Sequence, residues 1–246
     1  MSSPKERIDK LLVDRNLVQS RERAKALIIA GKVFVDGHKT EKVGTLVDPD
    51  AHVVLKEKDF PYVSRGGVKL EYALDSFQLD VKNRIALDVG ASTGGFTHCL
   101  LLRGAQKVYA VDVGYGQLDW TLRNDPRVVC MERTNIRHLT ADRISDPISL
   151  AVTDTSFISL KKVLVPLLGL IEKEGEVLAL IKPQFELSPR EVGKGGVVRD
   201  PHLHTKVVED MVAFANGLGV DVRGTIESPL KGPKGNREFF IYLKKT

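Results

Sequence analysis

The stretch "LDVGASTGGFTHCLL", residues 87–101, has the form of an apolar strand, a glycine-rich turn and a helix. In α/β proteins this arrangement places a helix N-terminus where a nucleotide-like ligand can bind. Gly90 would allow a tight turn, while Gly94 and Gly95 would allow the backbone to approach the ligand closely. The glycines are not spaced as in a dinucleotide-binding GxGxxG motif. A strand-to-helix turn without a ligand is the alternative interpretation.

Short β-rich runs alternate with helical stretches on both sides of this motif. The expected strands are 85–90, 107–113, 127–132, 149–154, 176–182, 220–227 and 237–245. The expected helices are 66–78, 95–103, 116–123, 160–172 and 203–217. This alternation predicts an α/β fold with a doubly wound, Rossmann-like sheet of seven strands. Only "SPLKGPKGN" joins the last two strands, which is too short for a crossover, so the last strand should be antiparallel.

The first sixty residues have a different pattern. Two short helices are expected, and Ser20 is a suitable N-cap for the second helix, which Gly31 would end. Short strands follow around an Asp36-Gly37 turn. We therefore expect a small α+β domain over residues 1–60, a polar join with the sequence "KEKDFPYVSRGG", and a larger domain over residues 61–246.

Composition limits the classes of protein. The chain has 246 residues and a net charge of +5, which permits a polyanionic partner. It has no run of 18 apolar residues and no apolar segment near its first residues, so neither a membrane span nor a secretory signal is expected. Cys99 and Cys130 are isolated, which suits a reducing cytoplasm. His202 and His204 lack an evident third ligand, so no metal site is expected.

Acidic residues near the glycine turn indicate the kind of ligand. Asp112 ends the second expected strand, where a carboxylate can accept hydrogen bonds from ribose hydroxyls. Asp88 could hold an ammonium group of the ligand or order the turn. An adenosine with a charged amino-acid tail fits best, so S-adenosylmethionine is the leading candidate and a nicotinamide dinucleotide the second. Further contacts are expected from Ser92 and from Asn135, which could instead cap a helix.

Four charged residues are expected at the rim where the parallel strands end. Asp154 and Lys182 directly follow expected strands, and Glu238 begins the antiparallel one at the same rim. Lys69 lies on the helix that enters the first strand. The alternative is that each is a strand-end charge that faces water. Phe157 is expected to pack the turn beneath Asp154.

Several motifs identify a family. "SRGGVKL", "DVGASTGGFT", "DVGYGQL", "DTSFISL", "IKPQFE" and "SPLKGPKGNREFF" resemble the TlyA, or hemolysin A, family of ribosomal-RNA ribose methyltransferases. They are also similar, more distantly, to FtsJ-type ribose methyltransferases. The resemblance implies a catalytic tetrad of Lys69, Asp154, Lys182 and Glu238. It also implies methyl transfer from S-adenosylmethionine to a cytidine 2′-hydroxyl in rRNA of the small or large ribosomal subunit. His98 departs from the family pattern, in which an acidic residue is expected.

The chemistry gives each tetrad residue an expected role. Lys182 is the expected base for the ribose hydroxyl, whose oxygen must be positioned and must lose its proton. A free lysine has a pKa of about 10.4, so a lysine base needs desolvation or a neighbouring cation, such as Lys69 or the sulfonium. Asp154 and Glu238 would orient the lysines and the hydroxyl.

RNA contacts are expected in two regions. Residues 6–58 resemble a small RNA-binding module named after a small-subunit ribosomal protein, which implies RNA-backbone contacts. The implied contact residues are Arg21, Arg23, Lys25 and Lys32. Two glycine-rich loops of the larger domain carry basic residues that could hold RNA phosphates in a salt-dependent way, or could be ordinary loops. These residues are Lys194, Arg199, Lys231, Lys234 and Arg237.

Other functional classes compete with a methyltransferase. A non-catalytic RNA-binding or ribosome-binding factor would keep the fold without turnover. A hemolysin would need an apolar or amphipathic insertion segment, and none is evident in the sequence. A nicotinamide oxidoreductase is disfavoured by the glycine spacing and by two rim lysines that hydride transfer does not use.

Overall fold

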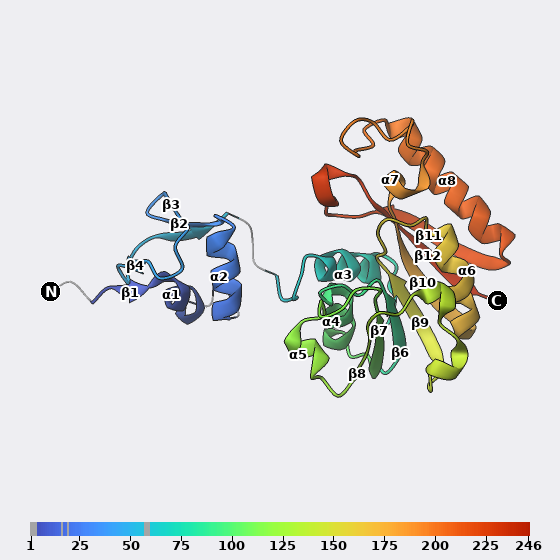
Figure 1. The fold of residues 1–246 in the computed structure, drawn as a ribbon, viewed down its shortest axis with the longest axis horizontal. Helices are drawn as coiled ribbons and strands as arrows, with labels where there is room; N and C mark the ends of the chain where they lie inside the picture. Colours follow the sequence, from blue (N-terminus) through green and yellow to red (C-terminus); the bar gives the residue numbers. More distant parts are fainter. Residues whose placement is uncertain (1–3, 16, 19, 57–59) are drawn as a thin grey trace. The chain divides into compact units, whose positions relative to one another are not determined.

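The computed structural model describes residues 4–15, 17–18, 20–56 and 60–246. The chain divides into two compact units, Met1–Pro61 and Tyr62–Thr246, and Figure 1 shows the elements of each. Residues 57–59, within the predicted polar join, lie outside the described residues.

The smaller unit combines two helices with short antiparallel strands. Ser20 caps the second helix as predicted, because its side chain accepts a hydrogen bond from the Arg23 backbone N–H. Asp36 and Gly37 have positive φ angles of 49° and 80°, as a two-residue hairpin turn requires. The elements are β1 (Glu6–Arg7), α1 (Ile8–Asp14), α2 (Arg21–Ile29), β2 (Val33–Val35), β3 (His38–Thr40), β4 (Leu46–Val47) and β5 (Val53–Leu55).

A fully buried carboxylate joins both helices of this unit. Asp9 has no exposed surface and accepts hydrogen bonds from Arg7 at 2.9 Å and from Arg21 at 2.7 Å. The hydrogen bond from Arg7, helped by Arg21, lowers the pKa of Asp9 to about 2. The Arg21 guanidinium therefore stabilises the fold of this unit, in addition to any contact with RNA.

The larger unit contains a seven-stranded sheet in the order β11-β12-β10-β9-β6-β7-β8. Strand β12 pairs antiparallel with both neighbours, and the pairs from β10 to β8 are parallel, so the predicted fold class and antiparallel last strand are confirmed. The strands are β6 (Ile85–Val89), β7 (Lys107–Val111), β8 (Val128–Met131), β9 (Ile148–Thr153), β10 (Ile171–Ile181), β11 (Val220–Glu227) and β12 (Phe239–Lys245).

Helices cover both faces of this sheet (Figure 1). Apolar residues of α6 and α8, among them Leu164, Leu167 and Met211, share one buried core with the strands. Helices α3 and α4 lie on the other side, where the Phe96 and Phe240 rings stack. The helices and turns are α3 (Gly66–Ser76), α4 (Gly95–Leu102), α5 (Trp120–Arg123), η1 (Ile136–His138), η2 (Ala141–Arg143), α6 (Lys161–Leu170), α7 (Pro183–Glu186), α8 (Pro201–Gly217) and η3 (Pro233–Gly235).

Some element boundaries differ from the predictions for local reasons. The helix expected at 116–123 begins only at Trp120, because Gly116 has a φ of 69° and Asp119 provides the N-cap. The last long helix begins at Pro201, two residues early, since Asp200 caps it. The short helix α7 was not predicted. Among the described residues, no helix is long and apolar enough to cross a membrane.

Candidate active site

The ends of two neighbouring parallel strands bring Asp154 and Lys182 together. Asp154 directly follows β9 and Lys182 directly follows β10, and Ala179 pairs with Thr153 between these strands. The Asp154 backbone N–H also donates to the Val89 carbonyl at 3.1 Å, which fixes the turn against β6. The Lys182 Nζ lies 2.5 Å from Asp154 Oδ1. The predicted meeting of these two residues at the rim is therefore present.

The contacts of Lys182 differ in kind. Its approach to Asp154 is an ion pair whose angles do not meet hydrogen-bond geometry, since Asp154 Oδ1 has no hydrogen-bond partner among the described residues. The directional bond of Lys182 runs to Ser156 Oγ, at 2.9 Å. Lys182 is only 7% exposed, so the ammonium is held on the protein side of the rim. Sequence reasoning assigned no role to Ser156.

A second ion pair joins α3 to the start of β12. Lys69 Nζ donates to Glu238 Oε2 at 2.6 Å, and these residues are 8% and 1% exposed. Gly232 packs directly on this carboxylate, because a Cβ on Gly232 would lie 1.9 Å from Glu238 Oε1. The alternative interpretation of rim charges that face water is therefore wrong for Lys69, Lys182 and Glu238.

One cavity of about 360 Å³ connects the two ion pairs. Lys69, Asp154, Ser156, Lys182 and Gly232 all line it. Three of the four predicted tetrad residues thus line this cavity, and the fourth, Glu238, lies behind its wall in contact with Lys69 and Gly232. Because these groups are mostly removed from water, electrostatic interactions with a bound substrate are stronger here than at the surface.

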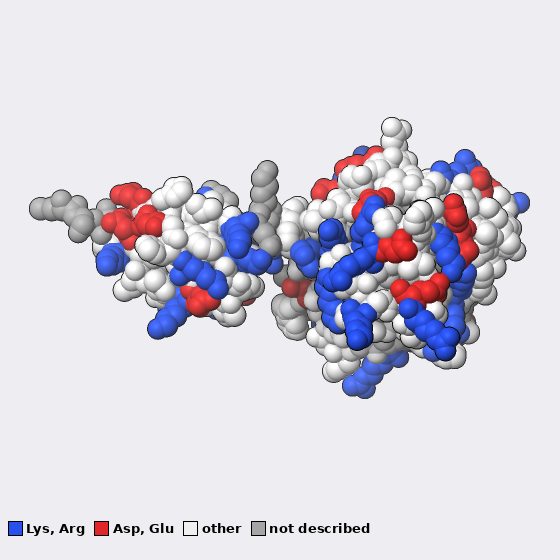
Figure 2. All heavy atoms as spheres, turned by 90° about the horizontal axis from the view of Figure 1, so that it is seen from above, with Lys and Arg blue, Asp and Glu red and all other residues white. Residues whose placement is uncertain are grey.

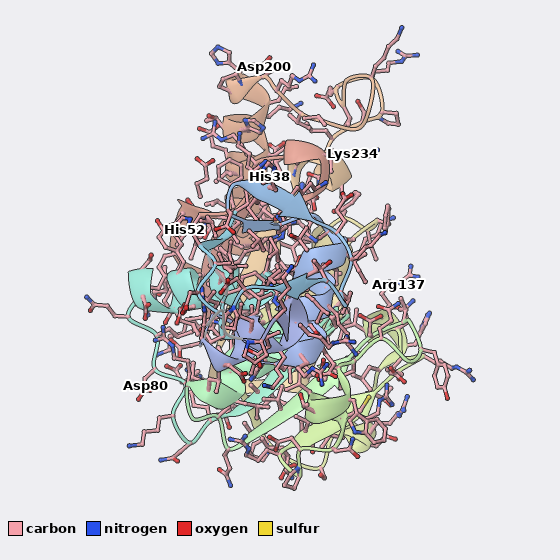
Figure 3. The ribbon with its side chains drawn as sticks, turned by 90° about the vertical axis from the view of Figure 1, so that its left-hand side faces the viewer. His38, His52, Asp80, Arg137, Asp200 and Lys234 are labelled. Atoms are coloured by element: carbon pink, nitrogen blue, oxygen red, sulfur yellow. The ribbon has the colours of Figure 1, made fainter. Side chains whose placement is uncertain are left out.

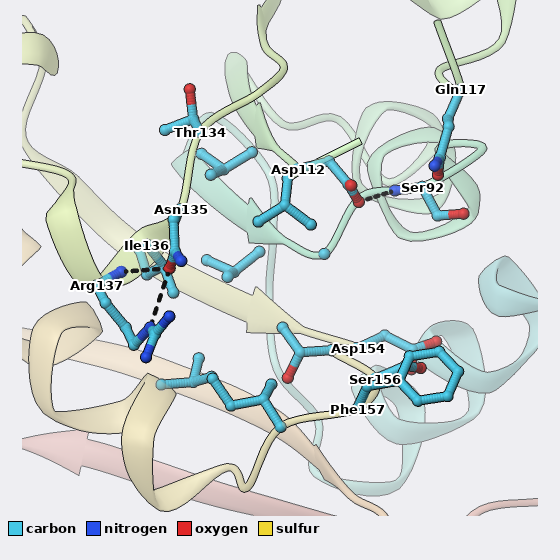
Figure 4. A pocket seen from close by; sticks show the side chains of 17 residues that line it. Ser92, Asp112, Gln117, Thr134, Asn135, Ile136, Arg137, Asp154, Ser156 and Phe157 are labelled. Atoms are coloured by element: carbon cyan, nitrogen blue, oxygen red, sulfur yellow. Dashed lines mark hydrogen bonds between the residues drawn. The ribbon is translucent and has the colours of Figure 1, made fainter. Parts of the chain in front are cut away.

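A second cavity, of about 520 Å³, lies beside the first (Figure 4). Both are lined by Gly90, Ser92, Asp154 and Ser156, so they meet at the glycine turn and at the Asp154 turn. In the second cavity, Asp112 accepts backbone hydrogen bonds from Ser92 at 2.8 Å and Gly114 at 2.7 Å. A molecule in the second cavity would therefore have one end next to Lys182.

The second cavity has the chemistry to hold an adenosine-type ligand. Each Asp112 oxygen accepts one backbone N–H and retains acceptor capacity for a ribose hydroxyl. Gly90 has a φ of 83°, a conformation that favours glycine. The walls are largely apolar and suit a flat base. These wall residues are Val89, Val111, Val113, Ile136, Ile158 and Val163.

Two of the predicted cofactor residues act on the fold instead of lining this cavity. Asp88 is fully buried and accepts a hydrogen bond from Thr97 Oγ1 at 2.7 Å, and burial raises its pKa to about 7. This carboxyl therefore joins β6 to α4, which agrees with the turn-ordering alternative. Gly94 has a φ of 95°, which favours glycine, and it packs closely on α5, since a Cβ there would lie 2.3 Å from the Leu122 side chain.

Asn135 has one of its two predicted roles, the helix N-cap, and its contact with a cofactor stays a prediction. It lines the larger cavity, and its Oδ1 accepts from the Arg137 backbone N–H at 3.1 Å as the N-cap of η1 (Figure 4). The Asn135 amide group is thus held in place at the cavity wall by η1.

The expectation that Phe157 packs beneath Asp154 is wrong. Phe157 is 91% exposed, with a φ of 63°, a conformation that costs energy for a residue with a side chain. Its ring lies 5.3 Å from that of Phe185. These rings and two basic residues, Arg137 and Lys162, line a further hollow of about 390 Å³. The turn therefore presents an aromatic face to solvent close to Lys182.

The two basic loops of the larger unit are tied together by Asn236. This residue is 2% exposed, accepts from the Val198 backbone N–H at 3.0 Å and donates to the Gly196 carbonyl at 2.8 Å. Lys234 also donates to the Gly195 carbonyl, and Figure 3 places Lys234 and Asp200 at the same end of this unit. Lys194, Arg199, Lys231 and Lys234 are exposed, whereas Arg237 forms an ion pair with Glu227.

Basic and acidic side chains are interspersed on the surface of each unit (Figure 2). In the smaller unit, Lys25 is exposed on α2, and Lys32 follows α2 and precedes β2. The Arg23 guanidinium lies 4.4 Å from the centre of the Phe60 ring. Contact of these residues with RNA stays a prediction.

Two of the three histidines that sequence analysis singled out have structural partners. His98 Nδ1 accepts a hydrogen bond from the Val63 backbone N–H at 3.2 Å, which fastens the start of the larger unit to α4. His204 is buried and its Nε2 lies 3.1 Å from the Val198 carbonyl. Within the described ranges, no three His, Cys, Asp or Glu side chains form a metal-binding group.

The fold and site define a class of protein. Residues 62–245 match the FtsJ-like methyltransferase family, and residues 6–53 match the S4 domain. A solved Listeria monocytogenes structure, named "putative S-adenosylmethionine dependent methyltransferase", shares the fold at 16% identity, with a TM-score of 0.54. The match covers 74% of this chain and 98% of the Listeria chain.

Whole-length relatives narrow the family. The chain is 49% identical over 239 residues to the "16S/23S rRNA (cytidine-2'-O)-methyltransferase TlyA" of Mycobacterium tuberculosis, covering 97% of this chain and 89% of the relative. It is 47% identical to the "Putative rRNA methyltransferase YqxC" of Bacillus subtilis, over 99% of this chain and 87% of the relative. A solved Streptococcus thermophilus structure, named "Putative hemolysin", is 44% identical with a TM-score of 0.78. The match covers 99% of this chain and 89% of the Streptococcus chain. The chain belongs to the TlyA family of FtsJ-like methyltransferases, with an S4 domain at its N-terminal side.

Proposed function

We propose that this protein transfers a methyl group from S-adenosylmethionine to a cytidine 2′-hydroxyl of ribosomal RNA. The observation that carries the proposal is the meeting of two cavities at Asp154 and Ser156. One has the glycine turn and the Asp112 carboxylate, as expected of a nucleoside site. The other is lined by the buried lysines Lys69 and Lys182 and by Asp154. The relatives named for this reaction on 16S and 23S rRNA support the same choice of substrate.

The methyl donor would occupy the larger cavity. Asp112 would accept the ribose hydroxyls of the donor, Asn135 would face the adenine edge, and the apolar walls would enclose the base. S-adenosylmethionine supplies a methyl group on a positively charged sulfur, which an oxygen nucleophile can attack in line. Gly90 and Ser92, shared by both cavities, would line the end of the donor nearest the acceptor.

Lys182 is the residue that would take the proton of the 2′-hydroxyl. It lines the acceptor cavity and is fixed by Asp154 and Ser156. In its ion pair with Asp154, Lys182 is an ammonium, so it would have to release a proton before it can act as the base. The neutral amine would then accept the proton of the 2′-hydroxyl as the oxygen bonds to the methyl carbon and the methyl–sulfur bond breaks. Asp154, 2.5 Å away, would stabilise the positive charge that forms on Lys182 in this step. The carboxylate therefore favours the transition state more than the starting state.

Lys69 and Glu238 would shape the acceptor side. Their ion pair is buried and internally neutral, so it can hold a ribose by hydrogen bonds without adding net charge to the cavity. Glu238 Oε1 is buried and has no hydrogen-bond partner in the described part of the chain. A substrate hydroxyl would satisfy this acceptor if the packing over Gly232 opened locally.

RNA would be held by the smaller unit and by the two basic loops. Phe157 would stack on the base of the target nucleotide once that base is turned out of its helix, since an exposed aromatic ring beside the reactive group is a platform for a base. Phosphate contacts from the basic residues would make binding fall steeply with salt.

The experiment is transfer of labelled methyl from S-adenosylmethionine to small subunits, large subunits, intact ribosomes and naked rRNA. The proposal expects label at a cytidine whose 3′ phosphodiester resists alkaline cleavage, because the 2′-hydroxyl is blocked. Cofactor binding without label in any of these RNAs would contradict it and favour a non-catalytic RNA-binding protein. Label on a base or on protein would contradict the proposed acceptor.

A further inference from the structure

Resting on the proposed function, we infer that Ser156 is a positioning residue that sets the direction in which Lys182 presents its lone pair. The residue type of Ser156 does not by itself indicate a role in catalysis. Its place in the structure is distinctive, because it lines both cavities and its hydroxyl bonds to the proposed base.

The geometry of an amine explains the inference. Besides its carbon substituent, Lys182 Nζ has three tetrahedral positions, each holding a proton in the ammonium and one holding the lone pair in the neutral amine. The Ser156 hydroxyl occupies one position by a 2.9 Å hydrogen bond, and the Asp154 carboxylate lies beside a second. Because the Asp154 contact is not a hydrogen bond, a position remains for a group in the cavity that Lys182 lines.

Ser156 and Asp154 contribute different parts of this arrangement. The Asp154 contact is close but does not have hydrogen-bond angles, so it stabilises charge without fixing rotation about the Cε–Nζ bond. The Ser156 contact does have hydrogen-bond geometry. Ser156 therefore selects the rotation of the amine that leaves the free position directed at the substrate.

The backbone holds Ser156 where this bond can form. Asp154, two residues earlier, is bonded to the Val89 carbonyl through its backbone N–H. Phe157, the next residue, adopts a positive φ of 63°. A turn fixed at one side and bent sharply at the other places the hydroxyl toward Lys182 and the aromatic ring toward solvent. The same turn thus serves the base and the RNA-facing surface.

The test is steady-state methyl transfer to rRNA by the full chain and by Ser156→Ala, Ser156→Thr and Ser76→Ala. Ser76 is a matched control because it is exposed at the end of α3 and its hydroxyl donates to the Tyr72 carbonyl. We expect Ser156→Ala to lower kcat by about 10- to 100-fold while KM for S-adenosylmethionine and for rRNA changes little. Ser156→Thr, which keeps a hydroxyl, should recover most of kcat, and Ser76→Ala should match the parent.

The possible outcomes separate this inference from the proposed function. Unchanged kcat in Ser156→Ala, with normal labelling by the parent protein, overturns the role of Ser156 and leaves the proposed function standing. A rise in KM for S-adenosylmethionine at constant kcat also overturns it, because Ser156 would then be a cofactor contact. Absence of labelling by the parent protein overturns the proposed function itself. Thermal melting of each variant identifies any loss of folding, and Ser156→Thr keeps the inference testable if Ser156→Ala melts early.

Discussion

Lys69 and Glu238 are 169 residues apart in the chain, yet their charged groups lie 2.6 Å apart in the protein interior. The pair connects the helix that enters the first strand of the sheet to the antiparallel strand β12. A buried ion pair is not by itself a strong source of stability, but removal of one partner leaves a charge without compensation. The pair therefore links the stability of the larger unit to the shape of the acceptor cavity.

Replacement of one partner tests this link. Glu238→Gln should destabilise the larger unit by about 3 kcal/mol, because the Lys69 ammonium stays buried without a counter-charge. Lys69→Met combined with Glu238→Gln should cost less than the sum of the single changes, since no buried charge is left. Urea unfolding of the single and double variants measures this coupling. Strictly additive free energies of unfolding would contradict an energetic link between the two residues.

Gly232 should be intolerant of any side chain. A Cβ at this position would lie 1.9 Å from Glu238 Oε1, so Gly232→Ala must move the carboxylate or the loop. We expect methyl transfer to fall by about 10-fold or more while cofactor affinity is kept. Gly169→Ala is the control, because nothing lies within 4 Å of a Cβ there. Equal kcat for both variants would show that the position of Glu238 is unimportant for turnover.

Replacement of Phe157 should weaken RNA recognition without lowering the stability of the larger unit. Loss of a base-stacking contact should weaken kcat/KM for rRNA by about 10- to 100-fold in Phe157→Gly, since such contacts contribute about 1–3 kcal/mol. The same change should leave the melting temperature equal or higher, because glycine adopts the positive φ of this position without strain. Phe157→Trp should retain activity. A large drop in melting temperature for Phe157→Gly would instead indicate a packing role.

The smaller unit should lose stability in acid through Asp9. Its folded pKa of about 2 lies below the ordinary value of 3.8, so the contribution is fully present above about pH 4 and disappears as the pH falls through 2. That difference corresponds to about 2 kcal/mol. Asp9→Asn should therefore lower hydrogen-exchange protection in α1 and α2 near neutral pH, and the difference from the parent should vanish near pH 2. A difference independent of pH would contradict an electrostatic origin.

Sequence patterns predicted the sheet and its reversed last strand because both depend on local periodicity and on the length of one connection. They also placed Asp154 and Lys182 at one rim, since each directly follows a parallel strand. They did not predict that Phe157 faces solvent, because an aromatic residue after a strand is usually packed. That outcome depends on a positive φ angle, which the residue type does not indicate.

Other features depend on contacts between distant segments. Asp88 and Gly94 stand in a motif typical of ligand binding, yet tertiary packing uses them to join β6, α4 and α5. The tie between the two basic loops depends on a buried Asn236 that no spacing in the sequence distinguishes. Ser156 could have been suspected from its place two residues after Asp154, but its bond to Lys182 arises only when β9 and β10 lie side by side.

The most direct test of the central claim is the rate of ribose methylation of rRNA by Lys182→Ala beside Lys173→Ala. Lys173 lies on the same strand, near its opposite end, and is exposed. The account predicts that Lys182→Ala binds S-adenosylmethionine but labels no alkali-resistant ribose above background, while Lys173→Ala labels at the parent rate. Substantial labelling by Lys182→Ala would contradict the assignment of the base and, with it, the proposed mechanism.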